Sequence, residues 1–330
     1  MLLIVNYHYI GNTAFPFPGI HPLSPQVFRR QLEALADSFE FVGEADLLSA
    51  VAGESDLPEI ACLLTFDDGL REQYTQAVPI LDEFGVSAIF FVPGLPLDQG
   101  RPLTVHKIHW LRSQMEPVVF HDCLSAACRE FGLMDRVQVA ENDAGGKYYW
   151  DDSETRKAKY LLNVLLSAQE RAQVVDAMES RVDLDGRDYF EQLYLTPEQI
   201  KELDNRFAVG THGYSHCALA SMSKRDMGHD ISHSLAVLSR MGCHPKTISY
   251  PYGYDGTVSP TVFDVAKAHN LCAGFTTERS FNTTLTEPLA LARIDTNDAP
   301  GGKQPIVVRG HDGFQLTGVM TMGRTRYCQE

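Results

Sequence analysis

The sequence feature that most constrains the fold is a short apolar run, residues 60–66 (IACLLTF), which ends directly at Asp67, Asp68 and Gly69. A run of this length without alternation is typical of a strand buried on both faces, as in a parallel sheet covered by helices. Two adjacent carboxylates at the end of such a strand are costly unless a positive group lies beside them. Asp-Asp-Gly is also common in turns, so the motif alone leaves a plain surface turn open.

The rest of the chain repeats a strand–helix rhythm around this run. Further strands are predicted at residues 2–7, 39–42, 88–92, 207–210, 247–250, 273–276 and 289–294. Helical patterns begin at residues 24, 44, 72, 196, 224 and 260. Because these units never settle into an antiparallel alternation, we expect an α/β fold built as a barrel of parallel strands.

Residues 100–195 interrupt this rhythm with a helix-rich stretch. We expect this stretch to be a helical insertion that caps one end of the barrel. On this interpretation residues 1–330 form a single barrel domain.

Charge and apolar patterning exclude several partners and predict a location. With 43 Asp and Glu against 28 Lys and Arg, the net charge of −15 repels phosphate backbones, so we expect no nucleic-acid polymer as partner. The longest apolar runs, residues 89–93 and 161–166, are far shorter than the roughly 20 residues that span a bilayer. The N-terminus has no basic segment before its short apolar run, and the seven cysteines are scattered. These features predict no signal peptide, reduced thiols and a cytoplasmic location.

A second chemical motif follows the strand predicted at residues 207–210. His212 and His216 are four residues apart, a spacing that places both imidazoles on one face of a helical turn. Such pairs are common by chance, but a carboxylate from another strand end would complete a set of two histidines and one carboxylate with open positions. That set suits a catalytic divalent ion, with zinc expected and cobalt, nickel or iron also accepted.

A third segment, residues 249–253 (SYPYG), lies at the end of the strand predicted at 247–250. It contains no metal ligand. The side chains of Pro251 and Tyr252 could line a substrate pocket, although a simple turn explains the segment equally well.

Taken together, TFDDG, the HxxxH pair and the YPYG turn resemble, in their order, the polysaccharide deacetylase family, also called carbohydrate esterase family 4. Residues 6–8 (NYH) and the helix that opens at Ser24 resemble longer members of this family. The resemblance covers roughly residues 1–96 and 195–297. It implies an irregular (β/α)7 barrel that removes an N-acyl group from an amino sugar with the help of a metal ion.

The resemblance also implies roles for individual residues. It makes Asp68, His212 and His216 the metal ligands. Asp67 becomes the general base that takes a proton from the attacking water. The oxyanion would be held by the metal and a backbone N–H, with Tyr252 beside it.

The sequence departs from the family pattern at Ser249, where the family usually has an arginine that orients the base. We expect Arg293, after a later predicted strand, to substitute by pairing with Asp67 through two hydrogen bonds. A surface salt bridge of Arg293 is the alternative.

The general acid of the family is a histidine near a C-terminal strand. His311 is the candidate in that part of the chain. His8, at the end of the first predicted strand, is the alternative and could instead contact substrate or be a buried structural histidine.

A cytoplasmic location favours a nucleotide- or lipid-linked amino sugar as substrate, a precursor in lipopolysaccharide O-antigen or capsule synthesis. The helical insertion would then enclose a small or medium-sized ligand. Two other functions stay open: an amidohydrolase acting on a cyclic ureide or imide, and a carbohydrate-binding protein without turnover, which the serine at position 249 would explain.

Overall fold

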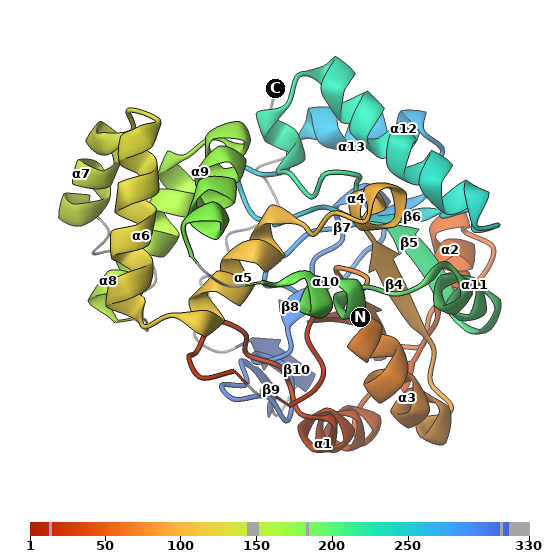
Figure 1. Ribbon diagram of the computed structural model, residues 1–330. Coiled ribbons are helices and arrows are strands. Elements are labelled where there is room, and N and C mark those ends of the chain that lie inside the picture. Colours follow the sequence, from red (N-terminus) through yellow and green to blue (C-terminus); the bar gives the residue numbers. More distant parts are fainter. Residues whose placement is uncertain (13–14, 144–151, 183–184, 311–312, 317–330) are drawn as a thin grey trace. The chain divides into compact units, whose positions relative to one another are not determined.

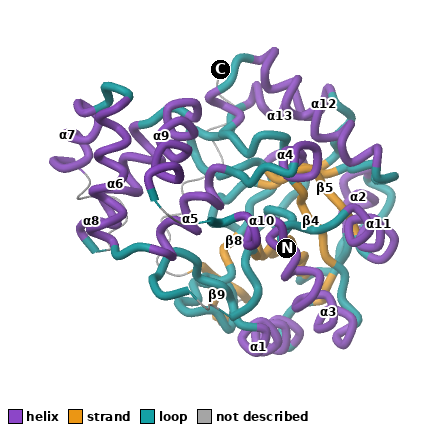
Figure 2. Tube along the Cα trace, viewed as in Figure 1, coloured by secondary structure: helices purple, strands orange, loops and turns teal. Residues whose placement is uncertain are grey.

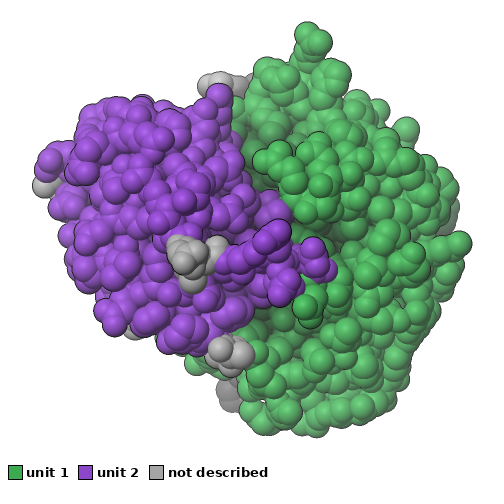
Figure 3. All heavy atoms as spheres, in the orientation of Figure 1, with its two compact units in different colours: residues 1–12, 22–101, 192–330 green, residues 13–21, 102–191 purple. Residues whose placement is uncertain are grey.

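The computed structural model describes residues 1–12, 15–143, 152–182, 185–310 and 313–316 (Figure 1). The chain forms two compact units, which Figure 3 distinguishes by colour. Unit 1 consists of residues 1–12, 22–101 and 192–330, and unit 2 of residues 13–21 and 102–191. The single-domain arrangement with a capping insertion stays a prediction.

Unit 1 is built on an eight-stranded sheet in which every strand pair is parallel. Its strands are β1 (Leu2–Tyr7), β2 (Glu40–Phe41), β3 (Ala61–Phe66), β4 (Ala88–Val92), β5 (Ala208–Thr211), β6 (Thr247–Ser249), β7 (Ala273–Phe275) and β8 (Ile294–Asp295). The order is β7-β6-β5-β4-β3-β1-β8, with β2 paired to β3 off this path. A parallel bridge from Phe275 of β7 to Leu291, just before β8, links the two ends of the path. The predicted α/β barrel architecture is therefore confirmed.

Helices surround these strands, as Figures 1 and 2 show. The helices of unit 1 are α1 (Pro25–Ala36), α2 (Glu44–Ala52), α3 (Val78–Phe84), α4 (Gly94–Gln99), α11 (Pro197–Arg206), α12 (Lys224–Arg240) and α13 (Pro260–Ala268). A π-helical turn (Gln73–Ala77) precedes α3, and 3-10 turns occupy Leu219–Ser221 and Pro288–Ala290. Local signals set several starts: Ser24 caps α1 by accepting from the Val27 amide, and a reciprocal capping box of Thr196 and Gln199 begins α11.

The two apolar faces of the central strands explain their unbroken hydrophobic sequence. All six residues of β1 and all six of β3 are buried. Alternate residues pack outward in a layer with helix α1: Leu3, Val5, Cys62, Leu64, Phe28 and Leu32. The intervening residues pack inward with residues of β4 and β7: Leu2, Ile4, Leu63, Phe91 and Phe275. Asn6 and Thr65 continue this inward series, so the polar site begins where the apolar interior ends.

Unit 2 is helical and has its own hydrophobic core, which includes Trp110, Leu124, Leu161 and Val174. Its helices are α5 (Thr104–Gln114), α6 (Pro117–Glu130), α7 (Met134–Asp143), α8 (Ser153–Tyr160) and α9 (Ala168–Arg181), with a π-helical turn at Leu161–Leu165. Helix α10 (Arg187–Leu193) follows them in the chain. Within the described residues, no helix is both long and apolar enough to cross a membrane.

Two parts of the C-terminal region differ from the sequence prediction. The strand expected at 289–294 is replaced by the 3-10 turn Pro288–Ala290 and the short β8, because Leu291 pairs with β7 whereas Ile294 pairs with β1. Beyond it, β9 (Val307–Gly310) and β10 (Gly313–Leu316) form a separate antiparallel hairpin.

Candidate active site

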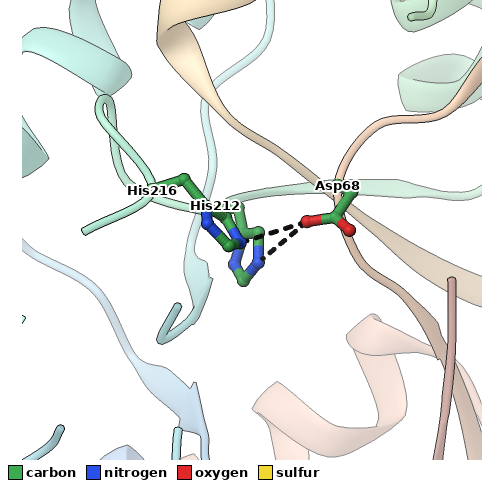
Figure 4. A group of neighbouring side chains, drawn as sticks. All are labelled: Asp68, His212 and His216. Carbon is green, nitrogen blue, oxygen red and sulfur yellow. Dashed lines mark ion pairs between the residues drawn. The ribbon is translucent and has the colours of Figure 1, made fainter. Parts of the chain in front are cut away.

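Three potential metal ligands converge at the carboxyl ends of β3 and β5. The two strands flank β4 in a parallel sheet, so their ends reach the same edge. Asp68 Oδ1 lies 3.5 Å from His212 Nε2 and 3.2 Å from His216 Nε2 (Figure 4). All three residues are buried, and their ligand atoms lie within 4.8 Å of one another. Among the described residues this is the one such group of histidine, cysteine and carboxylate side chains.

The backbone at these ligands adopts conformations that side chains other than glycine rarely take. Asp68 has φ of 76° and His216 has φ of 56°. Gly69 follows with φ of 60°, so the Asp-Gly pair turns the chain sharply after β3. Aspartate tolerates this region better than most residues, so a residue suited to a tight turn can also be a candidate ligand here.

The two histidines converge from an irregular loop, and not from the helical turn that their spacing predicted. Asp230 of α12 holds this loop: Oδ1 accepts from the Tyr214 amide at 2.7 Å, and Oδ2 accepts from the Ser215 amide at 3.0 Å and the Ser215 hydroxyl at 2.5 Å. A Cβ at Gly213 would come within 2.8 Å of Asp230 Oδ1, so glycine permits this close approach. No sequence motif pointed to Asp230, because its link to the loop depends on how α12 packs.

The tautomer of His212 follows from its hydrogen bond to the main chain. Nδ1 lies 2.7 Å from the Ser249 carbonyl oxygen, which can only accept, so Nδ1 carries a hydrogen. In the neutral imidazole, Nε2 then carries no hydrogen, and its lone pair is available near Asp68. Metal-binding histidines have the same arrangement. Burial favours the neutral ring, but the charges of Asp67 and Asp68 outweigh it and raise the pKa of His212. Two imidazoles and a carboxylate oriented in this way fit a divalent ion.

Asp67 and Arg293 form a buried pair next to this group. Arg293 Nη1 donates to Asp67 Oδ1 at 2.9 Å and Nη2 donates to Oδ2 at 2.8 Å. The Arg293 Nε donates to the Thr276 carbonyl at 3.0 Å, and the whole residue is 1% exposed. The surface salt bridge considered for Arg293 is therefore wrong, because the side chain lies in the interior.

Asn6 and Ser249 complete the hydrogen bonding of this pair. Ser249 Oγ lies 2.8 Å from Arg293 Nη2 and 3.1 Å from Asp67 Oδ2. Asn6 donates from Nδ2 to Asp67 Oδ2 at 3.1 Å and accepts at Oδ1 from Arg293. Asn6 was not among the predicted site residues, and Ser249 was expected only as a departure from the family pattern. Their position at the ends of β1 and β6 is the signal that could have identified them.

The charged groups around Asp67 lower its pKa far below the usual range of an aspartate. Burial alone would raise it, but the charge of Arg293 outweighs burial, with His212 and His8 adding to the effect. Asp67 is consequently ionised at any pH at which the protein would work.

The remaining predicted site residues fall in two places. His8 directly follows β1, and since Tyr7 pairs with Phe66, His8 lies level with Asp67. Gln73 connects the two segments by donating to the carbonyls of His8 (3.0 Å) and Asp67 (2.6 Å).

The segment of Pro251 and Tyr252 contacts the loop that carries the two histidines. The ring of Tyr252 packs edge-on against His216 with centroids 5.3 Å apart, and Tyr252 has φ of 65°. Pro251 is buried near Gly213. His311 lies outside the described residues.

A parallel α/β barrel with a buried carboxylate beside a candidate metal cluster, both at its strand ends, has the arrangement of an enzyme active site. The chain belongs to the polysaccharide deacetylase family: the family model of that description matches residues 54–109 and 149–273, more than half of the chain. The match includes part of the 100–195 stretch, which we had expected to lie outside the resemblance.

Solved structures of deacetylases share the fold. The Streptococcus pyogenes deacetylase PplD, in complex with acetate, is 16% identical with a TM-score of 0.53, over 89% of this chain and 91% of that one. IcaB from Ammonifex degensii is 18% identical with a TM-score of 0.54, over 91% and 94%. A de-N-acetylase from Aggregatibacter actinomycetemcomitans is 15% identical with a TM-score of 0.51, over 89% and 94%. No curated protein matches the sequence significantly.

Proposed function

We propose that this deacetylase removes an N-acetyl group from an amino sugar by metal-assisted hydrolysis. One observation carries the proposal: Asp67, fixed by Arg293, directly precedes Asp68, whose carboxylate meets His212 and His216. The proposed base and one of the proposed ligands are thus neighbours on one turn of the chain.

Asp68, His212 and His216 would hold the metal ion. Two imidazole nitrogens and one carboxylate oxygen suit zinc, which we propose as the ion, and also accept cobalt, nickel or iron. Such an ion supplies Lewis-acid chemistry, since it polarises the acyl carbonyl and acidifies water.

Asp67 acts as the general base in this proposal. Its two oxygens are held by Arg293, Asn6 and Ser249, so its orientation is fixed before substrate arrives. The lowered pKa of Asp67 keeps its carboxylate ionised and therefore able to accept a proton.

His8 is the proton donor that the described residues support. It directly follows β1 level with Asp67, its charge is one of those that act on Asp67, and it is only partly buried. We propose that it protonates the leaving amine, with His311 as the alternative.

The position of Arg293 favours catalysis over a binding function without turnover. The serine at position 249 was the reason to consider lost activity, but Ser249 and Arg293 both contact Asp67. The proposed base therefore keeps an arginine partner, which comes from the segment before β8.

For the substrate, we propose a nucleotide- or lipid-linked amino sugar, a precursor in O-antigen or capsule synthesis, handled in the cytoplasm. Cell fractionation tests the location.

Acetate release from a panel of substrates tests the activity. The purified protein, loaded with zinc, is given acetylated UDP-sugars, lipid-linked acetamido sugars, chitin oligomers and a cyclic imide. Release from the linked sugars supports the proposal, whereas release from chitin oligomers alone excludes the precursor substrate, and hydrolysis of the imide alone excludes a sugar deacetylase.

The variant Asp67→Asn tests the base. We expect it to lower kcat by about 10²- to 10⁴-fold while zinc binding persists. The matched control is Asp82→Asn, which changes a surface aspartate paired with Arg206. Unchanged acetate release by Asp67→Asn would refute the assignment.

A further inference from the structure

Gln73 is a fully buried polar side chain between the two strand ends that lead to His8 and Asp67. It is the first residue of the π-helical turn Gln73–Ala77, and the Val78 amide donates to its carbonyl with the five-residue spacing of a π-helix. Such turns are rare and frequently lie at functional sites. The side chain at the start of this turn is therefore a candidate for a role in the reaction.

The hydrogen bonds of Gln73 fix the orientation of its amide. Nε2 donates to the carbonyls of His8 at 3.0 Å and of Asp67 at 2.6 Å, and Oε1 accepts from the Leu70 amide at 3.2 Å. The two carbonyls can only accept and the main-chain amide can only donate, so the nitrogen and the oxygen of the side chain have one arrangement. The whole polar end of Gln73 is thus used inside the protein.

This amide joins the two strands beyond the end of their ladder. The last paired residues of β1 and β3 are Tyr7 and Phe66, and the Asp67 amide donates to the Tyr7 carbonyl at 2.9 Å. The carbonyls that come next, those of His8 and Asp67, are both bonded by Gln73. Because one planar group bridges both carbonyls, the two residues cannot move apart without the loss of a buried hydrogen bond.

The two residues at the ends of this bridge are held differently. Asp67 is also fixed through its side chain, by Arg293 and by Ser249. The bond from Gln73 ties the main chain of His8 to this fixed residue, and the charge of His8 acts on that of Asp67. Loss of the bridge is therefore expected to displace His8 and to leave Asp67 in place.

We propose that Gln73 is a positioning residue of the reaction, which keeps His8, the proposed proton donor, beside Asp67, the proposed base. The inference rests on the proposed function and deepens it. A general acid and a general base act on the same reacting group, so their separation has to match it. A misplacement of about 1 Å can lower the rate by about 100-fold. Gln73 acts through the main chain of His8 and not on the substrate itself.

A double-mutant cycle tests this role in the zinc-loaded protein. Gln73→Met keeps the approximate size of the side chain and removes the amide. We expect it to lower kcat for acetate release by about 10- to 100-fold and to change KM by less than about threefold. In the background of His8→Gln, the same substitution should lower kcat by less than about threefold, because no donor is left to position.

Two further variants complete the kinetic test. Gln76→Met changes an exposed glutamine of the same π-helical turn and should keep the wild-type kcat. Gln73→Glu keeps the acceptor oxygen for the Leu70 amide and replaces the donor nitrogen, so it should show the same loss of kcat. It takes the place of Gln73→Met if that variant does not fold, and thermal unfolding of each variant identifies the temperature range for the comparison.

The ring of His8 gives a readout that does not need turnover. Its Cε1–H signal in NMR spectra of ¹³C-labelled protein is assigned by its loss in His8→Gln. We expect Gln73→Met to shift this signal, whereas the signal of the exposed His244 should stay unchanged.

The outcomes separate this inference from the proposed function. Equal losses of kcat in the two backgrounds, a loss that appears mainly in KM, or an unshifted His8 signal would each overturn the positioning role. An unchanged kcat in His8→Gln would also overturn it, while deacetylation itself would stand. A shifted His8 signal in a protein that releases acetate from no acetylated sugar would uphold the placement of His8 by Gln73 and overturn the proposed activity.

Discussion

Arg293 and Asp67, 226 residues apart in the sequence, form a two-pronged ion pair inside the barrel, with N–O distances of 2.9 and 2.8 Å. Their side chains are 1% and 3% exposed. Burying two charges is costly, and the pair is tolerated because Asn6, Ser249 and the Thr276 carbonyl satisfy the remaining groups. The pair therefore links the stability of the barrel to the orientation of Asp67, the proposed base.

Replacing Arg293 by methionine should destabilise the fold and inactivate the enzyme. The variant leaves the Asp67 charge buried without its partner, which costs about 3 to 5 kcal/mol in the free energy of unfolding. Urea unfolding of wild type and variant measures the difference. The control Arg206→Met removes a surface arginine that pairs with Asp82 and Glu202, and should cost less than about 1 kcal/mol. Equal effects of the two substitutions would contradict the prediction.

Removing the metal should lower the thermal stability of the protein. An ion that binds only the folded state and is present at 100 times its Kd raises the free energy of unfolding by about 2.7 kcal/mol. We expect zinc to raise Tm in the wild type, a chelator to reverse the rise, and His212→Ala to abolish it. The control His244→Ala changes an exposed histidine and should keep the response. A zinc response in His212→Ala that equals the wild type would argue against this ligand.

Asp230 should control metal affinity through the loop it holds. Asp230→Asn replaces one acceptor oxygen with an amide, so the loop amides lose a partner while the ligands themselves stay intact. Residues that orient metal ligands typically change affinity by about 10- to 100-fold. Zinc titration measures the Kd, and Asp264→Asn, an exposed position in α13, is the matched control. An unaltered Kd in Asp230→Asn would mean that the loop holds its shape without this helix.

Glu72 should make stability fall as the pH rises. Burial raises its pKa from 4.5 to about 7, and a hydrogen bond from Ile10 offsets this only in part. Between these values the folded state binds more protons than the unfolded state, so the free energy of unfolding decreases from about pH 4.5 to pH 7. Glu72→Gln should flatten the profile in this window, measured by urea unfolding at several pH values.

The control for Glu72 is Glu83→Gln, which changes a surface glutamate paired with Arg29. It should leave the slope of the profile as in the wild type. A Glu72→Gln profile as steep as that of the wild type would show that another group titrates in this window.

Local sequence patterns predicted those strands and helices whose structure depends mainly on their own residues. The apolar run that became β3 and the Ser24-Pro25 start of α1 are examples. The strand expected at 289–294 failed because its two halves pair with different neighbours. The helical turn expected for His212 and His216 failed because Asp230 holds their loop from outside the motif.

By itself, the sequence determined the α/β class and the residue types of the candidate site, since Asp67 and Asp68 are neighbours and the two histidines share one short segment. Only the tertiary structure decided which groups complete the site. Asn6, Ser249 and Arg293 come from β1, β6 and the segment before β8, and they meet Asp67 because parallel strands of a curled sheet direct their carboxyl ends to one edge. That convergence depends on strand order and on which side chains point inward, and neither is contained in the spacing of a motif.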